Sequence, residues 1–270
     1  MCLAMCLPPV GDTAGKIMAE MGVAPAFVAW SQFSIGFFLL LPFLGGGSDI
    51  LRLMRNWRVW LRGSLIASGI FCILTSAKTE PIATVFAAFF IGPILSYFLS
   101  AALLGERITG PRTALLFCGF VGVLMVVQPG SGAGLGILWA VLAGLFYGCF
   151  LVSSRWLSDV GSSRDLMMSQ LIVGALLLTP VGVVQIPEFT GKIAALTVLS
   201  GLASLVGNLL LLIAYRMMDA AKLAPLVYVQ LISATILSIT VFGDVPNGLA
   251  LFGLLVLLAS GFGSFLVRQA

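Results

Sequence analysis

Two charged side chains in the apolar first stretch of the chain are the residues best placed to do chemistry. Asp12 and Lys16 lie four residues apart, so a helix would put both on one face, where they can pair. Charges inside a membrane span are costly and usually face a cavity or each other, which makes them functional candidates. Asp12 could carry a proton, and Lys16 could hold a carboxylate or phosphate group. The alternative is a self-neutralising pair at the membrane edge, with Lys16 reaching the interface.

A more diffuse set of polar and aromatic residues also lies inside the apolar runs. Buried amides in lipid need partners on a neighbouring helix or in a watery cavity. Polar residues well inside their runs could therefore orient a substrate in a central cavity, and aromatic rings could stack on planar groups. Contacts between helices explain each single residue equally well. The candidate substrate-binding residues are Asp12, Lys16, Trp30, Gln32, Tyr97, Tyr147, Asn208, Tyr228 and Gln230.

One long stretch of the sequence occurs twice. Residues 79–129 consist of an apolar run, a short polar break and a second apolar run, and residues 217–267 have the same layout. A shift of 138 residues places Gly105 and Glu106 on Gly243 and Asp244. Both acidic residues end an apolar run beside glycine, so we expect them to cap or pin the turn into the next helix, with gating as the alternative.

The composition assigns the chain to the membrane. Hydrophobic residues make up 60% and charged residues 9%, against about 45–50% and about 25% in soluble proteins. The apolar runs show no alternation and approach the length of about 20 residues that a spanning helix needs, which predicts helices rather than a barrel. The basic residues form no single patch, so nucleic acid is not an expected partner. Histidine is absent and the cysteines show no metal-ligand spacing, so no metal or cofactor is expected.

Ten spans account for the apolar runs, and an interpretation with nine spans omits the first. With the N-terminus inside, the even-numbered connections and the C-terminal end hold eleven basic residues and the odd-numbered ones hold two. This asymmetry predicts that both termini are cytoplasmic. The ten predicted spans are residues 2–20, 25–44, 59–76, 81–104, 113–127, 137–157, 166–186, 193–215, 220–242 and 248–267.

A repeat of five spans inserts its second copy upside down. The predicted fold is therefore an all-α membrane protein of ten helices in two inverted repeats, residues 1–130 and 131–270. Secondary transporters built this way place a site near the bilayer midplane, at the interface of the repeats, and expose it to each side in turn. Glycines in the fifth and tenth spans predict close packing there, at a scaffold face or a dimer face.

Two passages carry a resemblance to a known family. LLGERITGPRTALLFCGFVGVLMV, from Leu103, and its looser copy VFGDVPNGLALFGLLVLLASG, from Val241, resemble the ten-helix EamA type of the drug/metabolite transporter superfamily. The start of the chain is similar to members with an Asp and a Lys in the first span, although Gln32 stands where such members often carry Arg. The resemblance implies movement of a small metabolite or drug, frequently export, across a bacterial inner membrane.

These observations predict a secondary-active transporter, expected to be an exporter of a small organic solute, that works by alternating access. A passive channel for small solutes is the alternative. No nucleophile motif, histidine or facing aspartate pair suggests an enzyme. The expected partners are the substrate and the lipid bilayer, with proton coupling through Asp12 as a hypothesis and either a monomer or a homodimer as the assembly.

Overall fold

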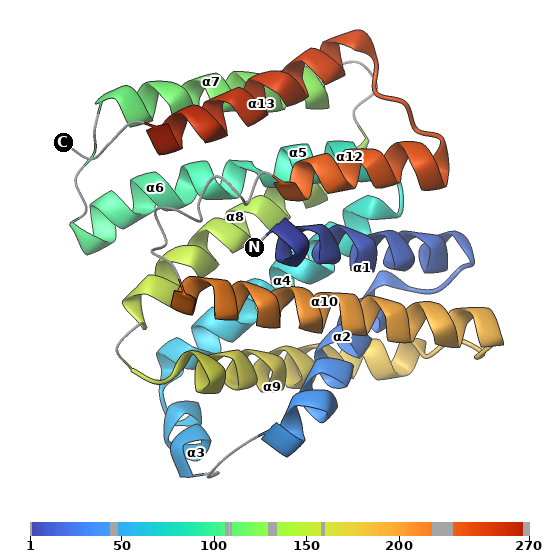
Figure 1. Ribbon diagram of the computed structural model, residues 1–270. Coiled ribbons are helices and arrows are strands. Elements are labelled where there is room, and N and C mark those ends of the chain that lie inside the picture. The colour runs from blue at the N-terminus through green and yellow to red at the C-terminus, as the bar shows by residue number, and fades with distance from the viewer. Residues whose placement is uncertain are drawn as a thin grey trace.

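The protein, seen here in a computed structural model, is built from α-helices that pack against one another (Figure 1). The structure describes residues 2–43, 48–105, 108, 110–128, 134–157, 160–217 and 229–266. Within these ranges it contains helices and no strands, which confirms the predicted all-α class. The helices are α1 (Cys2–Glu20), α2 (Pro25–Leu40), α3 (Ser48–Met54), α4 (Trp57–Ala77), α5 (Ile82–Phe89), α6 (Ile91–Leu104), α7 (Gly110–Val127), α8 (Leu135–Trp156), α9 (Ser163–Gly182), α10 (Gly191–Met217), α12 (Val229–Phe242) and α13 (Gly248–Leu266), with short 3-10 turns η1 (Leu41–Phe43) and η2 (Val183–Gln185).

Length and composition allow five helical segments of the described chain to cross a membrane. In the described part, five helical segments are long and apolar enough, with α5 and α6 counted as one, and four shorter helices are also apolar. Helix α1 contains Pro8, Pro9, Asp12 and Lys16 and is not among them. It nevertheless packs inside the molecule, against α10 and α12. The first predicted span therefore forms a helix that neighbouring helices cover.

Several helix ends follow from local sequence. Pro25 occupies the first turn of α2, where its missing N–H leaves no bond unmade. The Asn56 side chain accepts a hydrogen bond from the backbone N–H of Arg58 and begins α4. Gly105 and Gly243 follow the last residues of α6 and α12 with φ of 70° and 71°, a left-handed conformation that glycine adopts without a Cβ penalty.

The helix bounds follow the shift of 138 residues found in the sequence. That shift carries the first and last residues of α6 onto those of α12, and Gly105 onto Gly243. It also carries the first residue of α7 onto the first residue of α13. The counterpart of α5 falls in residues 220–227, which lie outside the described residues.

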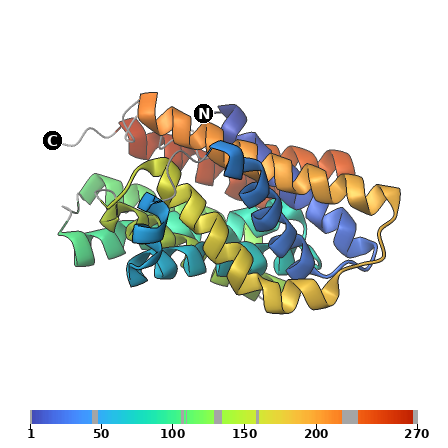
Figure 2. The same ribbon diagram turned by 90° about the horizontal axis from the view of Figure 1, so that it is seen from below.

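Helix pairing shows the same correspondence in space. The contact of α1 with α10 has its counterpart in the contact of α8 with α4, and that of α1 with α12 in that of α8 with α6. In two further contacts, α2 with α9 and α7 with α13, a helix packs against its own counterpart from the other repeat. These two pairs lie at opposite edges of the molecule (Figure 1). Seen from below, α2 lies between α9 and α10 (Figure 2). The candidate residues of α1, α2, α9 and α10 are thereby brought toward one region.

Small residues set the closest approaches between helices. An added Cβ on Gly122 of α7 would lie 2.8 Å from the Gly253 carbonyl oxygen of α13, and one on Gly119 would lie 2.7 Å from the Ser260 hydroxyl oxygen. These contacts join two helices of the same chain, so the glycine pattern serves the scaffold packing that was one of its two expected roles.

Candidate functional site

A buried polar contact joins α1, α2 and α10 in the interior. The Gln32 side-chain amide donates to the Ser200 hydroxyl at 2.8 Å, and that hydroxyl donates to the Gly11 carbonyl oxygen at 2.8 Å. The Asp12 carboxylate forms a side-chain hydrogen bond with Gln32. All three side chains are at least nine-tenths buried. Each polar group therefore depends on a partner from another helix, because lipid and apolar side chains offer none.

The local sequence of α1 permits this contact. Gly11 faces α10 so closely that an added Cβ would lie 3.1 Å from the Ser200 carbonyl oxygen. Gly15 similarly faces Leu74 of α4, with an added Cβ 2.7 Å from a Leu74 methyl carbon. The absence of side chains at these two positions lets α1 sit deep between its neighbours, with Asp12 inside.

A narrow cavity adjoins this contact. It holds about 20 Å³ of free space, room for about one water molecule. Amide groups of Gln32, Gln170 and Asn208 reach it from α2, α9 and α10, and the rest of the lining is mostly apolar. Asn208 donates to the Ser204 carbonyl oxygen at 2.8 Å, which fixes its amide orientation. We call the buried contact and the polar cavity lining together the central polar cluster: Asp12, Gln32, Gln170, Ser200, Ser204 and Asn208.

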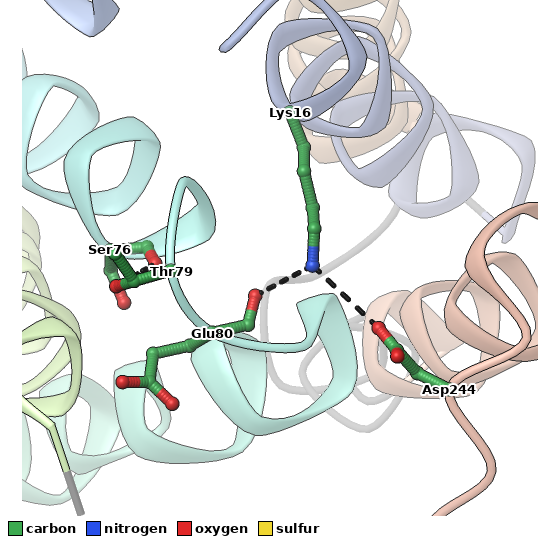
Figure 3. Close-up of polar contacts among 5 residues, drawn as sticks. All are labelled: Lys16, Ser76, Thr79, Glu80 and Asp244. Carbon is green, nitrogen blue, oxygen red and sulfur yellow. Dashed lines mark hydrogen bonds and ion pairs between the residues drawn. The ribbon is translucent and has the colours of Figure 1, made fainter. Parts of the chain in front are cut away.

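Lys16 lies one turn further along α1 and reaches two other elements (Figure 3). Its Nζ donates to the Glu80 carbonyl oxygen at 2.9 Å and lies 3.6 Å from Asp244 Oδ2. The ammonium also stands 4.6 Å from the centre of the Phe242 ring, within range of a cation–π interaction. Lys16 is 7% exposed. This arrangement, the Lys16 bridge, connects α1 to the α4–α5 connection and to the end of α12.

The end of α12 is shaped so that Asp244 meets Lys16. The positive φ of Gly243 turns the chain at this point. The Gly243 N–H donates a hydrogen bond to the Ile239 carbonyl oxygen, and the Asp244 N–H donates one to the Ser238 carbonyl oxygen. The side chain of Glu80 points away from Lys16, so only its backbone oxygen takes part (Figure 3). The self-neutralising pair of Asp12 and Lys16, one of the two alternatives, is therefore not what the structure shows. Lys16 pairs with Asp244, and Asp12 contacts Gln32.

A larger pocket lies beside the Lys16 bridge. It measures about 310 Å³ and is lined by the α4–α5 connection, the ends of α7 and α12 and the α12–α13 connection. Its polar lining includes Glu80, Gln128, Asp244 and Asn247. Gln128 and Asn247 exchange hydrogen bonds of 2.8 and 3.2 Å between their side chains, which ties α7 to the start of α13.

The remaining sequence candidates are not gathered at this site. The Trp30 indole N–H donates to the Thr179 hydroxyl at 3.1 Å, and the Tyr97 hydroxyl lies 3.4 Å from that of Thr113, so both join neighbouring helices. The Tyr147 ring packs 4.7 Å from that of Phe89. Gln230 is half-buried on α12. Glu106 and Tyr228 lie outside the described residues.

Sequence reasoning missed Ser200 and the Glu80 carbonyl as partners of the candidate residues. Serine is common in membrane helices as a link between them, and a backbone carbonyl carries no residue-specific signal. The position of Gln170 in the cavity lining follows only from the packing of α9 on α2.

The apolar helices and the polar residues buried between them fit a multi-pass membrane protein, and comparison with known proteins gives the family. The sequence profile of the EamA-like transporter family matches residues 2–128 and 134–266. The chain belongs to this family, as its resemblance to EamA-type members of the drug/metabolite transporter superfamily indicated.

Named relatives agree with this assignment. The chain is 28% identical over 257 residues to a riboflavin transporter of Rhizobium johnstonii, covering 93% of this chain and 83% of the relative. It is 26% identical over 234 residues to an S-adenosylmethionine uptake transporter of Rickettsia conorii, covering 86% and 79%. A crystal structure with 18% identity superposes with a TM-score of 0.68 and covers 99% of this chain and 97% of its own.

These comparisons establish the coarse function. The protein is a multi-pass membrane transporter of small metabolites and not an enzyme. The direction of transport, its coupling and its mechanism are matters of proposal.

Proposed function

We propose that the protein is a secondary-active carrier that works by alternating access around the central polar cluster. The observation that carries this proposal is the Lys16 bridge, which holds three separate elements together and shares Glu80 and Asp244 with the lining of the pocket of about 310 Å³. A single ion pair with a partly exposed partner is weak enough to break and re-form, because solvent screens it. Opening of the bridge would connect the pocket to the central polar cluster.

The Lys16 bridge lies on the outer side of the membrane in this proposal. The bridge lies at the Ala77 end of α4, whereas Arg52, Arg55 and Arg58 lie at its Trp57 end. Since basic residues favour the cytoplasm, the bridge faces outward and both termini lie inside, in a bacterial inner membrane. The division into inverted repeats of residues 1–130 and 131–270 belongs to this proposal, and the matching bounds of α6 and α12 support it.

Three buried hydroxyls add support for a region that rearranges. The side chains of Thr13, Ser76 and Ser238 have no hydrogen-bond partner among the described residues. They come from α1, α4 and α12, where the Lys16 bridge also makes its contacts. Buried polar groups rarely remain unpaired, so we infer that these hydroxyls gain water or substrate as partners in another state.

The substrate is proposed to be a solute that offers hydrogen-bond donors to Asp12 and to the amide oxygens of the cluster. Riboflavin and S-adenosylmethionine, which appear in the relatives' names, are the first compounds to test. Export is the direction that the family resemblance suggests, whereas the Rickettsia relatives are named for uptake. Transport should therefore be measured in both directions.

Proteoliposome counterflow tests the proposal. Liposomes preloaded with one candidate compound should take up its radiolabelled form with saturable kinetics. Lys16→Met should lower this exchange, and Lys192→Met, an exposed lysine at the start of α10, serves as the matched control. Flux that does not saturate and is insensitive to preloading would replace the carrier with the channel alternative.

Proton coupling is proposed to reside at Asp12, the buried carboxylate of the cluster. Asp12→Asn keeps the shape of the side chain but cannot gain or lose a proton. We expect this variant to retain counterflow and to lose accumulation driven by a pH gradient, while Glu188→Gln, at an exposed position between η2 and α10, retains both. Full gradient-driven accumulation by Asp12→Asn would exclude Asp12 as the proton site.

A further inference from the structure

A buried arginine lies near the opposite end of α4 from the Lys16 bridge. Arg62 is 9% exposed, about one and a half helical turns from the first residue of α4. Its Nε donates to the Ser154 hydroxyl at 2.8 Å and its Nη1 to the Leu166 carbonyl oxygen at 3.0 Å. Its guanidinium also stands 4.8 Å from the centre of the Phe150 ring. These contacts join α4 to α8 and α9 but leave part of the five-donor guanidinium group unused.

The charge of Arg62 has no counterpart in the described part of the chain. The ion pair found there joins Lys16 to Asp244, and no described carboxylate lies within 4.0 Å of Arg62. A buried charge is costly unless an opposite charge approaches it. An anion from outside the chain would supply that charge.

Arg58 lies one turn nearer the start of α4, on the same face as Arg62. Its guanidinium stands 4.1 Å from the centre of the Trp156 ring and 5.9 Å from that of Trp57. In the part of the chain that the structure describes, this guanidinium stacks on aromatic rings and forms no ion pair. A guanidinium group over the face of a ring can still donate from its N–H groups to a phosphate, which arginine binds in a forked geometry.

The surroundings hold both arginines in place. Leu53, Val59, Leu157 and Leu166 form a small buried core that fixes α3 and α4 to the end of α8 and the start of α9. The Trp60 indole N–H donates to the Met54 carbonyl oxygen at 2.8 Å and ties α3 to α4. The site is therefore preorganised.

Three exposed tryptophans lie at the ends of α4 and α8, close to the two arginines in the sequence or in space. Trp57 is 63% exposed, Trp156 40% and Trp60 39%. Exposed tryptophans at the end of spanning helices are typical of the boundary between lipid and water. Basic pockets between such helices bind the head groups of anionic lipids.

We propose that Arg58 and Arg62, between α4 and α8, bind the phosphate group of an anionic phospholipid, whose acyl chains lie against the exposed tryptophans. The phosphate accepts hydrogen bonds from the free donors of both guanidinium groups, and its charge balances that of Arg62. A lipid bound to these arginines stabilises the contacts among α3, α4, α8 and α9, on the side opposite the Lys16 bridge. This role does not depend on which solute is transported.

The test compares lipid binding in nanodiscs and by native mass spectrometry. The full-length protein is placed in phosphatidylcholine nanodiscs with increasing phosphatidylglycerol, and the melting temperature is recorded. We expect phosphatidylglycerol to raise the melting temperature of the wild type and to remain bound in the mass spectrometer. Arg58→Gln removes one charged contact and should weaken this binding about ten-fold. Arg58 is chosen because, unlike Arg62, its side chain makes no hydrogen bond to another helix in the described part.

Two further variants and one further ligand make the test decisive. Arg58→Lys keeps the charge and should retain part of the binding, and Lys192→Gln, at the far end of the molecule, should bind as the wild type does. Phosphatidylglycerol binding unaffected by Arg58→Gln would overturn the proposal. So would inorganic phosphate, in phosphatidylcholine alone, that reproduces the whole arginine-dependent stabilisation, because the site would then take free phosphate.

Discussion

Gln32 and Ser200 of the central polar cluster are held by partners on other helices. Gln32 illustrates this, because its amide contacts Ser200 of α10 and Asp12 of α1 while its own helix is α2. Gln32 thereby links α2 to α1 and α10, and in the proposed transport cycle it would exchange these partners for a substrate.

The substitution Gln32→Leu tests the structural part of this role. Leucine has a similar size but leaves Ser200 and Asp12 without their partner, and a buried polar group left unpaired costs about 1–3 kcal/mol. We expect a lower melting temperature in detergent, followed by fluorescence-detected size exclusion. Gln185→Leu, at an exposed position in η2, should leave the melting temperature unchanged. Equal stability of the two variants would contradict the role of the Gln32 contact.

Asp244 shows how a residue with a local expectation acquires a distant partner. Its position after Gly243 indicated a role at a helix end, and its backbone N–H does end α12. Its carboxylate, however, reaches Lys16 at the other end of the sequence. The two roles are connected, since the left-handed turn at Gly243 aims the carboxylate.

At the scale of helices, backbone contact between α6 and α8 fixes the break that separates α5 from α6. An added Cβ on Gly92 would lie 2.5 Å from the Gly144 carbonyl oxygen, and one on Gly144 would lie 2.7 Å from that of Phe89. Pro93 has no N–H for a helical bond to Phe89, which helps to interrupt the helix there. The glycines let α8 approach this interrupted segment.

Gly92→Ala should therefore destabilise the protein. The new methyl group meets backbone, which cannot move aside as a side chain can, and overpacking of this kind costs about 1–3 kcal/mol. We expect a clear fall in melting temperature. Gly110→Ala is the matched control, since an added Cβ there meets nothing within 4 Å. A fall of the same size in both variants would assign the effect to the loss of glycine itself.

The end of α12 gives a second prediction for a helix. Alanine at position 243 would have to adopt the left-handed conformation, at a cost of about 1–2 kcal/mol. Gly243→Ala should lower the melting temperature and weaken the Lys16 bridge, seen as reduced counterflow. Gly248→Ala, at the start of α13, is the control because an added Cβ has open space and φ is not left-handed. Unchanged behaviour of Gly243→Ala would show that another conformation serves α12 equally well.

At the scale of the whole molecule, the two ends of α4 carry different chemistry. One end holds the Lys16 bridge and its pocket, and the other holds the arginines and tryptophans of the proposed lipid site. Taken together, the two proposals assign the rearrangement of the transport cycle to one end and stabilisation by lipid to the other.

Opening of the Lys16 bridge should be visible as accessibility. In a cysteine-free background with Ser204→Cys in the cavity lining, Lys16→Met removes the bridge and should increase labelling by a membrane-impermeant thiol reagent added outside. Lys192→Met should leave the labelling rate unchanged. Slower labelling after Lys16→Met would mean that the bridge holds the outer side open.

The orientation of the chain has a direct test. In the same background, a cysteine in place of exposed Lys78 should react with the impermeant reagent in intact cells, and one in place of exposed Arg55 should react only after permeabilisation. The expectation follows from the positive-inside distribution of the basic residues. The reverse pattern would place both termini outside.

Composition and periodic layout were enough to determine the class and much of the framework of this protein. Few charges and long apolar runs require helices in a membrane, because no other element satisfies its own backbone in lipid. The predicted spans 81–104 and 220–242 end at the last residues of α6 and α12, since a helix end before glycine depends on local sequence, but the start of α6 at Ile91 and of α12 at Val229 was not predicted. The prediction that Asp12 and Gln32 lie inside the protein as buried polar residues is also confirmed.

Only the tertiary structure decided which of these residues meet. Spacing along a helix reports neighbours on that helix, so it favoured Asp12 as the partner of Lys16. The packing of α1 between α10 and α12 instead brings Lys16 to Asp244 and to the Glu80 carbonyl, and Asp12 to Gln32. The burial of Arg62 between α4, α8 and α9 was equally invisible, because the sequence presents it as one more basic residue at the end of a span. Which helices become neighbours depends on the total free energy of the side-chain contacts along their whole surfaces. A short stretch of sequence contains only one side of each contact, so it does not reveal the partner.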